Sequence, residues 1–345
     1  MPHNPHTIAA LRDAIRARGP LTLADFMQIA LYHPQHGYYR HAKIGRAGDF
    51  MTSVSTGPVW GKIWARHFFK LLENFQSLEK TAAGTSRDWK KSAAIYEFGG
   101  NTGQFRDDVL TECPELDYRI FEAGDPLPEK MEGIVFSNEL IDALPFHRVR
   151  FRDGIWFELL VGLDGNENPI LIEGELRDSR LRSFVESNFG FVGDLKLEIC
   201  DFEICPAAED WIRQILSRLI RGYVITVDYG MTREEYFSKP RPAGTLRCYH
   251  KHTRNDDPLE HIGEQDITAD VDFTSFIAAG EAAGLETVLF TDQTHALLEI
   301  GRDVIEEITT RDAGRMSKDR NAIHQLLHPS MMGRRFKVLI QRKRG

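Results

Sequence analysis

The feature that most limits the fold of this chain is a series of short apolar runs that alternate with stretches of helical spacing from residue 93 onward. Short apolar runs are typical of buried strands, and the stretches between them can form crossover helices. The pattern predicts an α/β protein with a mainly parallel sheet. Strands are expected at 93–98, 118–122, 134–137, 223–228, 285–291 and 336–341.

The front of the chain has a different, helical pattern. Ile8, Leu11 and Ile15 recur at helical spacing before Gly19, and a second helix is expected to begin at Thr22, whose hydroxyl can cap it. A third helix and a polar linker are expected at 59–75 and 76–92. No apolar run is long enough to span a bilayer, so we expect no membrane insertion.

The first apolar run of the α/β part leads into a glycine-rich turn, Glu97-Phe98-Gly99-Gly100-Asn101-Thr102-Gly103. The turn does not fit the dinucleotide pattern GxGxxG in either register, which disfavours a nicotinamide oxidoreductase. It resembles the first motif of class I methyltransferases, Glu/Asp-x-Gly-x-Gly-x-Gly, with Asn101 at the middle glycine. Asparagine tolerates the left-handed backbone conformation better than most residues, so the turn can persist.

A second acidic residue, Glu122, is expected at the end of the next strand. A carboxylate at this place accepts hydrogen bonds from ribose hydroxyls in other nucleotide-binding α/β folds. The pair Glu97 and Glu122 therefore favours a nucleoside cofactor, although a plain strand-turn-helix without a ligand remains an alternative.

Five motifs spread along the chain indicate a particular family. They are residues 32–39 with 44–53, the block Asn138-Glu139-Leu140-Ile141-Asp142-Ala143-Leu144-Pro145, Val227-Asp228-Tyr229-Gly230, and residues 266–273 and 329–336. In this order they resemble the MidA-type family of S-adenosylmethionine-dependent methyltransferases, which methylates a protein arginine during respiratory complex I assembly.

The resemblance implies a class I (Rossmann-like) methyltransferase sheet with an N-terminal helical extension at 1–90. It implies a methyltransferase-like domain at 91–345 that carries an inserted subdomain at about 146–221, before the fifth strand. S-adenosylmethionine is the implied cofactor, a protein is the implied substrate or assembly partner, and two chains are expected to pair. The cofactor-binding residues expected are Gly48, Asp49, Glu97, Gly99, Asn101, Gly103, Glu122 and Asn138.

Three carboxylates are candidates for catalysis: Glu139, Asp228 and Asp272. An arginine acceptor is charged, so methyl transfer needs carboxylates that hold the guanidinium and promote loss of its proton. Structural alternatives remain for two of them. Glu139 could cap a following helix, and Asp272 could cap the helix expected from Phe273.

The chain also departs from the family. Only residues 123–133 separate Glu122 from the next strand, so the usual third strand of the sheet is expected to be missing. Val54-Ser55-Thr56-Gly57 stands where the family has Pro-Glu-Ile-Ser. These departures motivate an alternative, a catalytically degenerate methyltransferase fold that acts as a binding or assembly protein.

Composition excludes some partners and suggests a compartment. The net charge of −8 gives no general attraction to nucleic acid, so no nucleic-acid partner is expected. Cys113, Cys200, Cys205 and Cys248 form no CxxC pair, which predicts reduced structural thiols and no metal site. Reduced thiols favour a cytoplasmic protein.

Overall fold

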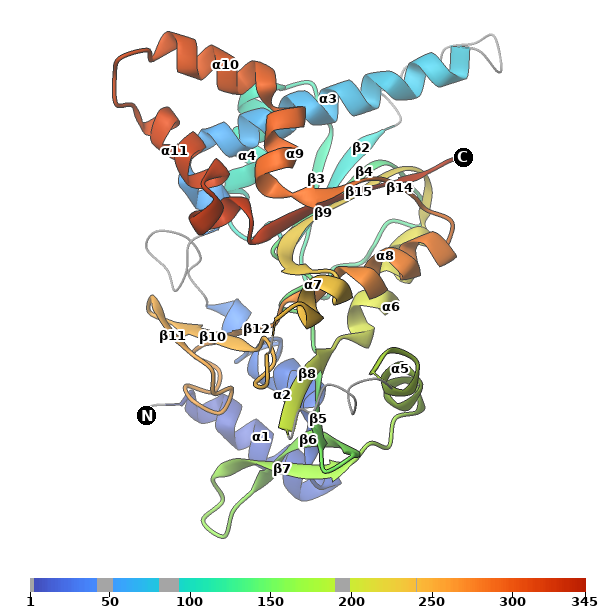
Figure 1. The fold of residues 1–345 in the computed structure, drawn as a ribbon, viewed down its shortest axis with the longest axis vertical. Coiled ribbons are helices and arrows are strands. Elements are labelled where there is room, and N and C mark those ends of the chain that lie inside the picture. Colours follow the sequence, from blue (N-terminus) through green and yellow to red (C-terminus); the bar gives the residue numbers. More distant parts are fainter. Residues whose placement is uncertain (1–2, 42–51, 81–92, 190–198, 240) are drawn as a thin grey trace. The chain divides into compact units, whose positions relative to one another are not determined.

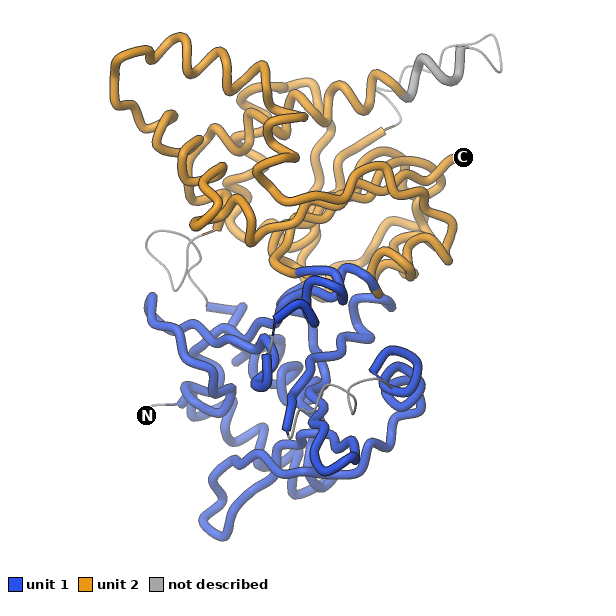
Figure 2. Tube along the Cα trace, in the orientation of Figure 1, with its two compact units in different colours: residues 1–50, 142–210, 231–274 blue, residues 51–141, 211–230, 275–345 orange. Residues whose placement is uncertain are grey.

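The computed structural model describes residues 3–41, 52–80, 93–189, 199–239 and 241–345. Contacts group the chain into two compact units, which Figure 2 colours separately. Unit 1 comprises residues 1–50, 142–210 and 231–274, and unit 2 comprises residues 51–141, 211–230 and 275–345. The chain passes between the units several times, so neither is one continuous stretch. The domain division expected at residues 90 and 91 stays a prediction.

Unit 2 is organised around one sheet, visible in Figure 1. Its strands lie in the order β3 (Tyr118–Phe121), β2 (Ala94–Phe98), β4 (Met131–Asn138), β9 (Leu219–Met231), β15 (Phe336–Lys343) and β14 (Glu286–Asp292). The first four are mutually parallel, whereas β15 is antiparallel to both of its neighbours. The predicted α/β fold with a mainly parallel sheet is therefore confirmed.

The expected loss of one strand is also confirmed within the described residues. β3 pairs with β2 alone and forms the edge of the sheet. Residues 122–130, which connect β3 to β4, contain no strand. The connection is too short for a further strand with its crossover helix, so β4 follows β3 directly in the chain.

Helices cover both faces of this sheet. One face is packed by α3 (Pro58–Lys80), α4 (Gln104–Glu112), α9 (Gln293–Ile300), α10 (Arg302–Arg311) and α11 (Lys318–Leu327). Trp64 lies at the centre of this layer, where its ring packs against Phe68 and Phe136. The other face is packed by α6 (Pro206–Leu216) and α8 (Phe273–Ala282), whose Trp211 and Phe276 rings stack. α3 extends five residues into the expected linker, and residues 81–92 lie outside the described residues.

Unit 1 combines the N-terminal helices with antiparallel sheets. Its elements are α1 (Pro5–Arg18), β1 (Leu21–Thr22), α2 (Leu23–Ala30), β5 (His147–Arg152), β6 (Ile155–Leu163), β7 (Pro169–Glu175), α5 (Ser179–Phe189), β8 (Ile199–Ile204), α7 (Arg233–Phe237), β10 (Arg247–His250), β11 (Thr253–Asn255), β12 (Asp266–Thr268) and β13 (Val271–Asp272). The Thr22 hydroxyl accepts a hydrogen bond from the Asp25 amide, as the capping pattern predicted. Gly19 ends α1 with φ +81°, a conformation that glycine adopts without strain.

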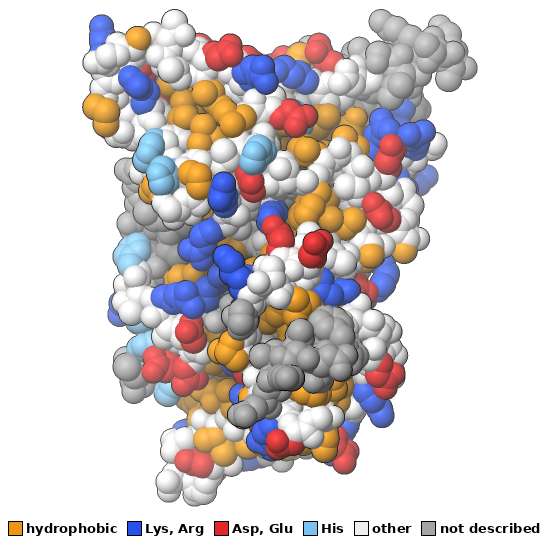
Figure 3. Space-filling view, in the orientation of Figure 1, with side chains coloured by type: hydrophobic (Ala, Val, Ile, Leu, Met, Phe, Trp, Pro, Cys, Tyr) orange, Lys and Arg blue, Asp and Glu red, His pale blue; other side chains and the backbone are white. Residues whose placement is uncertain are grey.

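The distribution of surface charge and the composition of the helices describe the molecule as a whole. Acidic and basic side chains are interspersed over each unit on the face shown in Figure 3. Among the described residues, the helices lack the combination of length and apolar composition that crossing a membrane requires.

A close approach of backbones in the sheet generates a prediction. Gly133 (φ +127°) on β4 faces Gly222 on β9, and a Cβ added to Gly133 would lie 2.2 Å from the Ala94 carbonyl oxygen. We expect Gly133→Ala to lower the free energy of unfolding by about 3 kcal/mol or more, because it adds backbone strain to a backbone clash. Urea unfolding measures the change. The control is Gly165→Ala, whose Cβ would meet no atom within 4 Å; equal stability of the two variants would contradict the prediction.

Candidate cofactor and acceptor site

The glycine-rich turn joins β2 to α4 in a strained, hydrogen-bonded conformation. Gly99 and Gly103 both have φ +74°, and Asn101 has φ +48°. The Gly99 amide donates to the Phe121 carbonyl at 2.9 Å, and the Gly103 amide donates to the Gly100 carbonyl at 3.0 Å. Asn101 thus adopts the left-handed conformation expected of it, and the turn forms without the middle glycine of the motif.

Glu97 lies beneath this turn and is 4% exposed. Its Oε2 atom is buried without a hydrogen-bond partner among the described residues. Burial raises the pKa of Glu97 from its ordinary 4.5 to about 7, the charge of Glu122 adds to the rise, and Tyr118 and Arg106 oppose it. A buried acceptor of this kind is costly unless a donor reaches it.

Glu122 ties the end of β3 to the same turn. Its Oε1 atom accepts a hydrogen bond from the Asn101 amide at 2.6 Å. Its own amide donates to Asp125 Oδ2 at 2.8 Å, and the Asp125 amide donates back to the Glu122 carbonyl at 3.0 Å. The carboxylate therefore stays beside the glycine turn although no strand follows β3.

A second turn, residues 138–141, leaves the end of β4 next to the first. A Cβ added to Gly99 would lie 3.1 Å from Leu140 Cδ1, so the two turns are in contact. Asn138 Oδ1 is buried without a hydrogen-bond partner among the described residues. Both turns follow the carboxyl ends of parallel strands, the edge at which α/β proteins bind their ligands.

Glu139 is held in this second turn by several elements. Its φ of +53° is unusual for a residue other than glycine, and such strain is often found at functional sites. Its Oε1 atom accepts hydrogen bonds from the Ser53 amide at 3.3 Å and from Asn138 Nδ2 at 3.0 Å. Its Oε2 atom accepts a hydrogen bond from the Tyr229 hydroxyl at 2.5 Å. No helix starts after Glu139 within residues 139–146, which excludes the capping alternative.

Asp228 anchors the same turn from the neighbouring strand β9. Its buried carboxylate accepts the amides of Leu140 at 3.2 Å, Ile141 at 2.8 Å and Tyr229 at 2.9 Å. These bonds satisfy backbone donors that the turn would otherwise bury without partners.

Asp272, the third candidate carboxylate, belongs to unit 1. It forms an ion pair with Arg233 at 2.9 Å, and its Oδ1 atom accepts the Thr274 amide at 3.0 Å in the first turn of α8. The capping alternative is thus the geometry observed. Glu139 and Asp228, by contrast, lie together in unit 2.

The sequence analysis missed a buried layer behind Glu139. The Ser53 hydroxyl donates to Gln293 Oε1 at 3.2 Å, and Gln293 Nε2 donates to the Leu326 carbonyl at 3.0 Å. Gln293 has no exposed surface, and it begins α9, a helix that the sequence analysis did not predict. The sequence did hold a signal for part of this layer, because Ser53 and Tyr229 both lie in motifs that carry the family resemblance. Gly48 and Asp49, which were also expected at the cofactor, lie outside the described residues.

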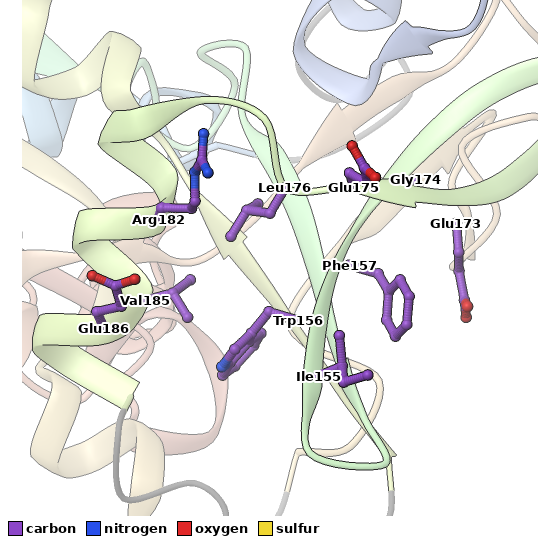
Figure 4. Close-up of a pocket in the computed structure, with 10 residues that line it drawn as sticks. All are labelled: Ile155, Trp156, Phe157, Glu173, Gly174, Glu175, Leu176, Arg182, Val185 and Glu186. Atoms are coloured by element: carbon purple, nitrogen blue, oxygen red, sulfur yellow. The ribbon is translucent and has the colours of Figure 1, made fainter.

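Among the described residues of unit 1, cavities lie in two places, and neither is lined by the glycine turn. The larger, of about 470 Å³, opens between α5 and the hairpin of β6 and β7, where the Trp156 ring points towards Val185 (Figure 4). The smaller, of about 30 Å³, is lined by Phe202, Arg233 and Asp272 among others. Within the described residues, no group of three or more His, Cys, Asp or Glu side chains is placed to hold a metal ion.

The turns of unit 2 fit a nucleoside cofactor that carries hydrogen-bond donors. Glu97 Oε2 and Asn138 Oδ1 are buried acceptors that lack partners among the described residues. The amino group and ribose hydroxyls of S-adenosylmethionine are donors of the kind that such acceptors need. Gly99 and Gly103 allow a ligand to approach the backbone closely.

Comparisons with known proteins agree with this geometry. Residues 121–291 match a family described as "Putative S-adenosyl-L-methionine-dependent methyltransferase". Protein arginine methyltransferase NDUFAF7 of Xenopus laevis, a mitochondrial protein, is 25% identical, over 94% of this chain and 81% of that protein. Its Drosophila melanogaster homologue is 23% identical, over 95% of this chain and 83% of that protein.

A solved structure shows the same fold. A Burkholderia thailandensis protein bound to S-adenosyl-homocysteine is 27% identical, with a TM-score of 0.83 over 99% of this chain and 92% of that one. The fold and the matches identify this chain as an S-adenosylmethionine-dependent methyltransferase. Within that class, its motifs and these matches are similar to those of the MidA-type family.

The predicted cytoplasmic location was wrong, because the curated relatives are mitochondrial proteins. The prediction rested on reduced cysteines, and all four cysteines are indeed free. Free thiols indicate only a reducing compartment, so they could not distinguish the cytoplasm from another such compartment.

The raised pKa of Glu97 predicts how stability changes with pH. Between pH 4.5 and 7 the folded protein keeps a proton on Glu97 that the unfolded chain has lost, so the free energy of unfolding falls as pH rises. Glu97→Gln lacks this dependence. We expect the stability of the variant relative to wild type to rise by roughly 2 to 3 kcal/mol between pH 5 and pH 8. Urea unfolding at both pH values measures this change. Glu115→Gln, at an exposed position, controls for removal of a charge. A difference in the free energy of unfolding that is the same at both pH values would contradict the prediction.

The contacts of Asp228 predict a graded loss of stability. Asp228→Ala leaves three backbone amides without their acceptor, and we expect it to lower the free energy of unfolding by about 3 kcal/mol. Asp228→Asn keeps one acceptor oxygen and should lose less. Urea unfolding of both variants is the measurement. A wild-type value for Asp228→Ala would show that the turn does not depend on this carboxylate.

Proposed function

We propose that this chain binds S-adenosylmethionine at the glycine turn of unit 2 and transfers its methyl group to an arginine side chain of a partner protein. The single observation that carries the proposal is the contact between two turns at the carboxyl ends of β2 and β4. One turn offers the buried acceptor of Glu97, and the other holds the carboxylate of Glu139. The arginine acceptor is proposed because the curated relatives are named protein arginine methyltransferases.

The proposed cofactor residues are Glu97, Gly99, Asn101, Gly103, Glu122 and Asn138, with Gly48 and Asp49 from the segment outside the described residues. When bound, the cofactor supplies an electrophilic methyl group on a sulfonium sulfur. Glu97 and Asn138 supply buried acceptors, and Glu122 supplies a carboxylate at the edge strand. The glycines keep side chains out of the space above the turn.

Glu139 is the proposed catalytic carboxylate. A guanidinium nitrogen that gains a methyl group loses one proton, and the electron pair of the broken carbon–sulfur bond stays on sulfur. The carboxylate of Glu139 accepts that proton, becomes neutral, and later releases the proton to solvent. Asp228 and Asp272 were expected to share this task. Their backbone and ion-pair contacts support positioning roles, and a direct part in catalysis stays a prediction for both.

Several finer features complete the proposal. Residues 1–90 are proposed as an N-terminal extension, and about 146–221 as an insertion before the fifth strand of the methyltransferase sheet. In support, β9 pairs in parallel with β4 and begins at Leu219, where such an insertion would end. Pairing of two chains and the absence of a nucleic-acid partner stay predictions. The alternative of a catalytically degenerate binding protein is not favoured, because the curated relatives are enzymes by name.

The proposed function predicts that one variant loses cofactor binding, whereas another keeps cofactor binding and loses methyl transfer. Calorimetry should show micromolar binding of S-adenosylmethionine by wild type and its loss in Glu97→Ala, because the buried acceptor is removed. Glu139→Gln should keep that affinity within about threefold but lower the methylation rate at least about 100-fold, because the proton acceptor is lost.

The acceptor assay uses a lysate of the source cells, labelled with methyl-tritiated cofactor and resolved into methylated amino acids. Label on arginine that depends on Glu139 supports the proposal, and label on another residue type would replace arginine as the acceptor. Absence of both binding and label in the wild type would overturn the proposal in favour of the binding protein.

A further inference from the structure

A hydroxyl group that the proposed function does not use lies against its central carboxylate. Tyr229 stands near the end of β9, and its hydroxyl donates to Glu139 Oε2 at 2.5 Å. Hydrogen bonds from a hydroxyl to a charged carboxylate have this short length and are stronger than bonds between neutral groups. The contact joins residues 90 positions apart in the chain.

The Tyr229 ring is fixed by packing, so its hydroxyl has a defined place. The ring lies against Phe336, with centroids 4.4 Å apart, and the two residues are paired across β9 and β15. The Tyr229 amide in turn donates to Asp228 Oδ1 at 2.9 Å. The packing of the ring and the hydrogen bond of the amide thus both fix Tyr229, which gives its hydroxyl a defined position beside Glu139.

The two oxygens of Glu139 are oriented by donors from separate elements. Oε1 faces the Ser53 amide, at the start of the turn η2 (Val54–Thr56), and the side chain of Asn138 on β4. Oε2 faces Tyr229 on β9. Hydrogen bonds to the ionised form favour that form, and bonds on both oxygens restrict rotation of the carboxylate.

We infer that Tyr229 is a positioning residue that keeps the Glu139 carboxylate ionised and oriented to accept the proton of the methyl acceptor. The inference deepens the proposed function and rests on it for the identity of that acceptor. Tyr229 itself touches neither the cofactor nor the acceptor in this assignment. The proposed contribution to Glu139 passes through the hydroxyl, which can be removed without removing the ring.

Tyr229→Phe is the test, because phenylalanine keeps the packing on Phe336. The first readout is the titration of the Glu139 carboxyl carbon by NMR in protein without cofactor, with the signal assigned by Glu139→Gln. We expect the midpoint in Tyr229→Phe to move about one pH unit higher than in wild type, because one donor to the ionised form is lost.

The second readout is the pH profile of kcat/KM for methylation. The acidic limb should move to higher pH by a similar amount, so that activity falls near pH 6 and recovers near pH 9. Affinity for S-adenosylmethionine should stay within about twofold. The matched control is Tyr223→Phe, which removes a hydroxyl from the same strand beside Arg342, away from both turns. It should change neither the midpoint nor the profile.

Each outcome decides the inference. An unchanged NMR midpoint in Tyr229→Phe overturns it, and so does an equal loss of activity at every pH, which would indicate a merely structural role. A wild type that does not methylate would overturn the proposed function alone, because the NMR midpoint still decides whether Tyr229 controls Glu139.

Discussion

The site depends on the buried carboxylate of Asp228. A turn that leaves a parallel strand at the edge of a sheet exposes backbone amides that no neighbouring strand can satisfy. Asp228 accepts two of these amides, from Leu140 and Ile141, and so fixes the path of the chain after β4. The direction of Glu139 and the contact of Leu140 with Gly99 both follow from that path. One carboxylate therefore positions the glycine turn and the turn at residues 138–141 against each other.

The conformation of Glu139 shows how such a site is stabilised from several parts of the chain. A left-handed residue other than glycine costs on the order of 1 kcal/mol or more, so the contacts around it must offset that cost. The contacts come from Ser53, Asn138 and Tyr229, which lie on three different elements of unit 2. Behind Ser53, Gln293 and the Leu326 carbonyl extend the network into α9 and α11. The C-terminal helices thus hold the loop that orients the carboxylate.

Some of this arrangement could be predicted from the sequence and some could not. Apolar runs located the six strands β2, β3, β4, β9, β14 and β15, because strands of this kind leave a local pattern. β4 and β9 extend beyond the predicted runs, where Gly133 and Gly222 interrupt the apolar pattern. Helix α10 was missed because it buries only Val304 and Ile308, too few for a clear helical stripe. The left-handed conformation of Asn101 could be predicted, because asparagine tolerates it better than most residues. The hydrogen-bond partners of Glu139 could not be predicted. Ser53 and Tyr229 are 86 and 90 residues away, and no local pattern records such contacts.

The edge of the sheet at β3 keeps both acidic residues of the proposed cofactor site although no further strand follows. The reciprocal bonds of Glu122 and Asp125 keep Glu122 beside the glycine turn without a following strand. Two carboxylates then lie close enough that Glu122 helps to raise the pKa of buried Glu97 to about 7. A positively charged ligand relieves that repulsion, because an opposite charge favours the ionised form of both groups. S-adenosylmethionine carries a sulfonium charge that its demethylated product lacks. At the proposed cofactor site, the pair of carboxylates would therefore favour the sulfonium-bearing cofactor over its demethylated product on charge alone.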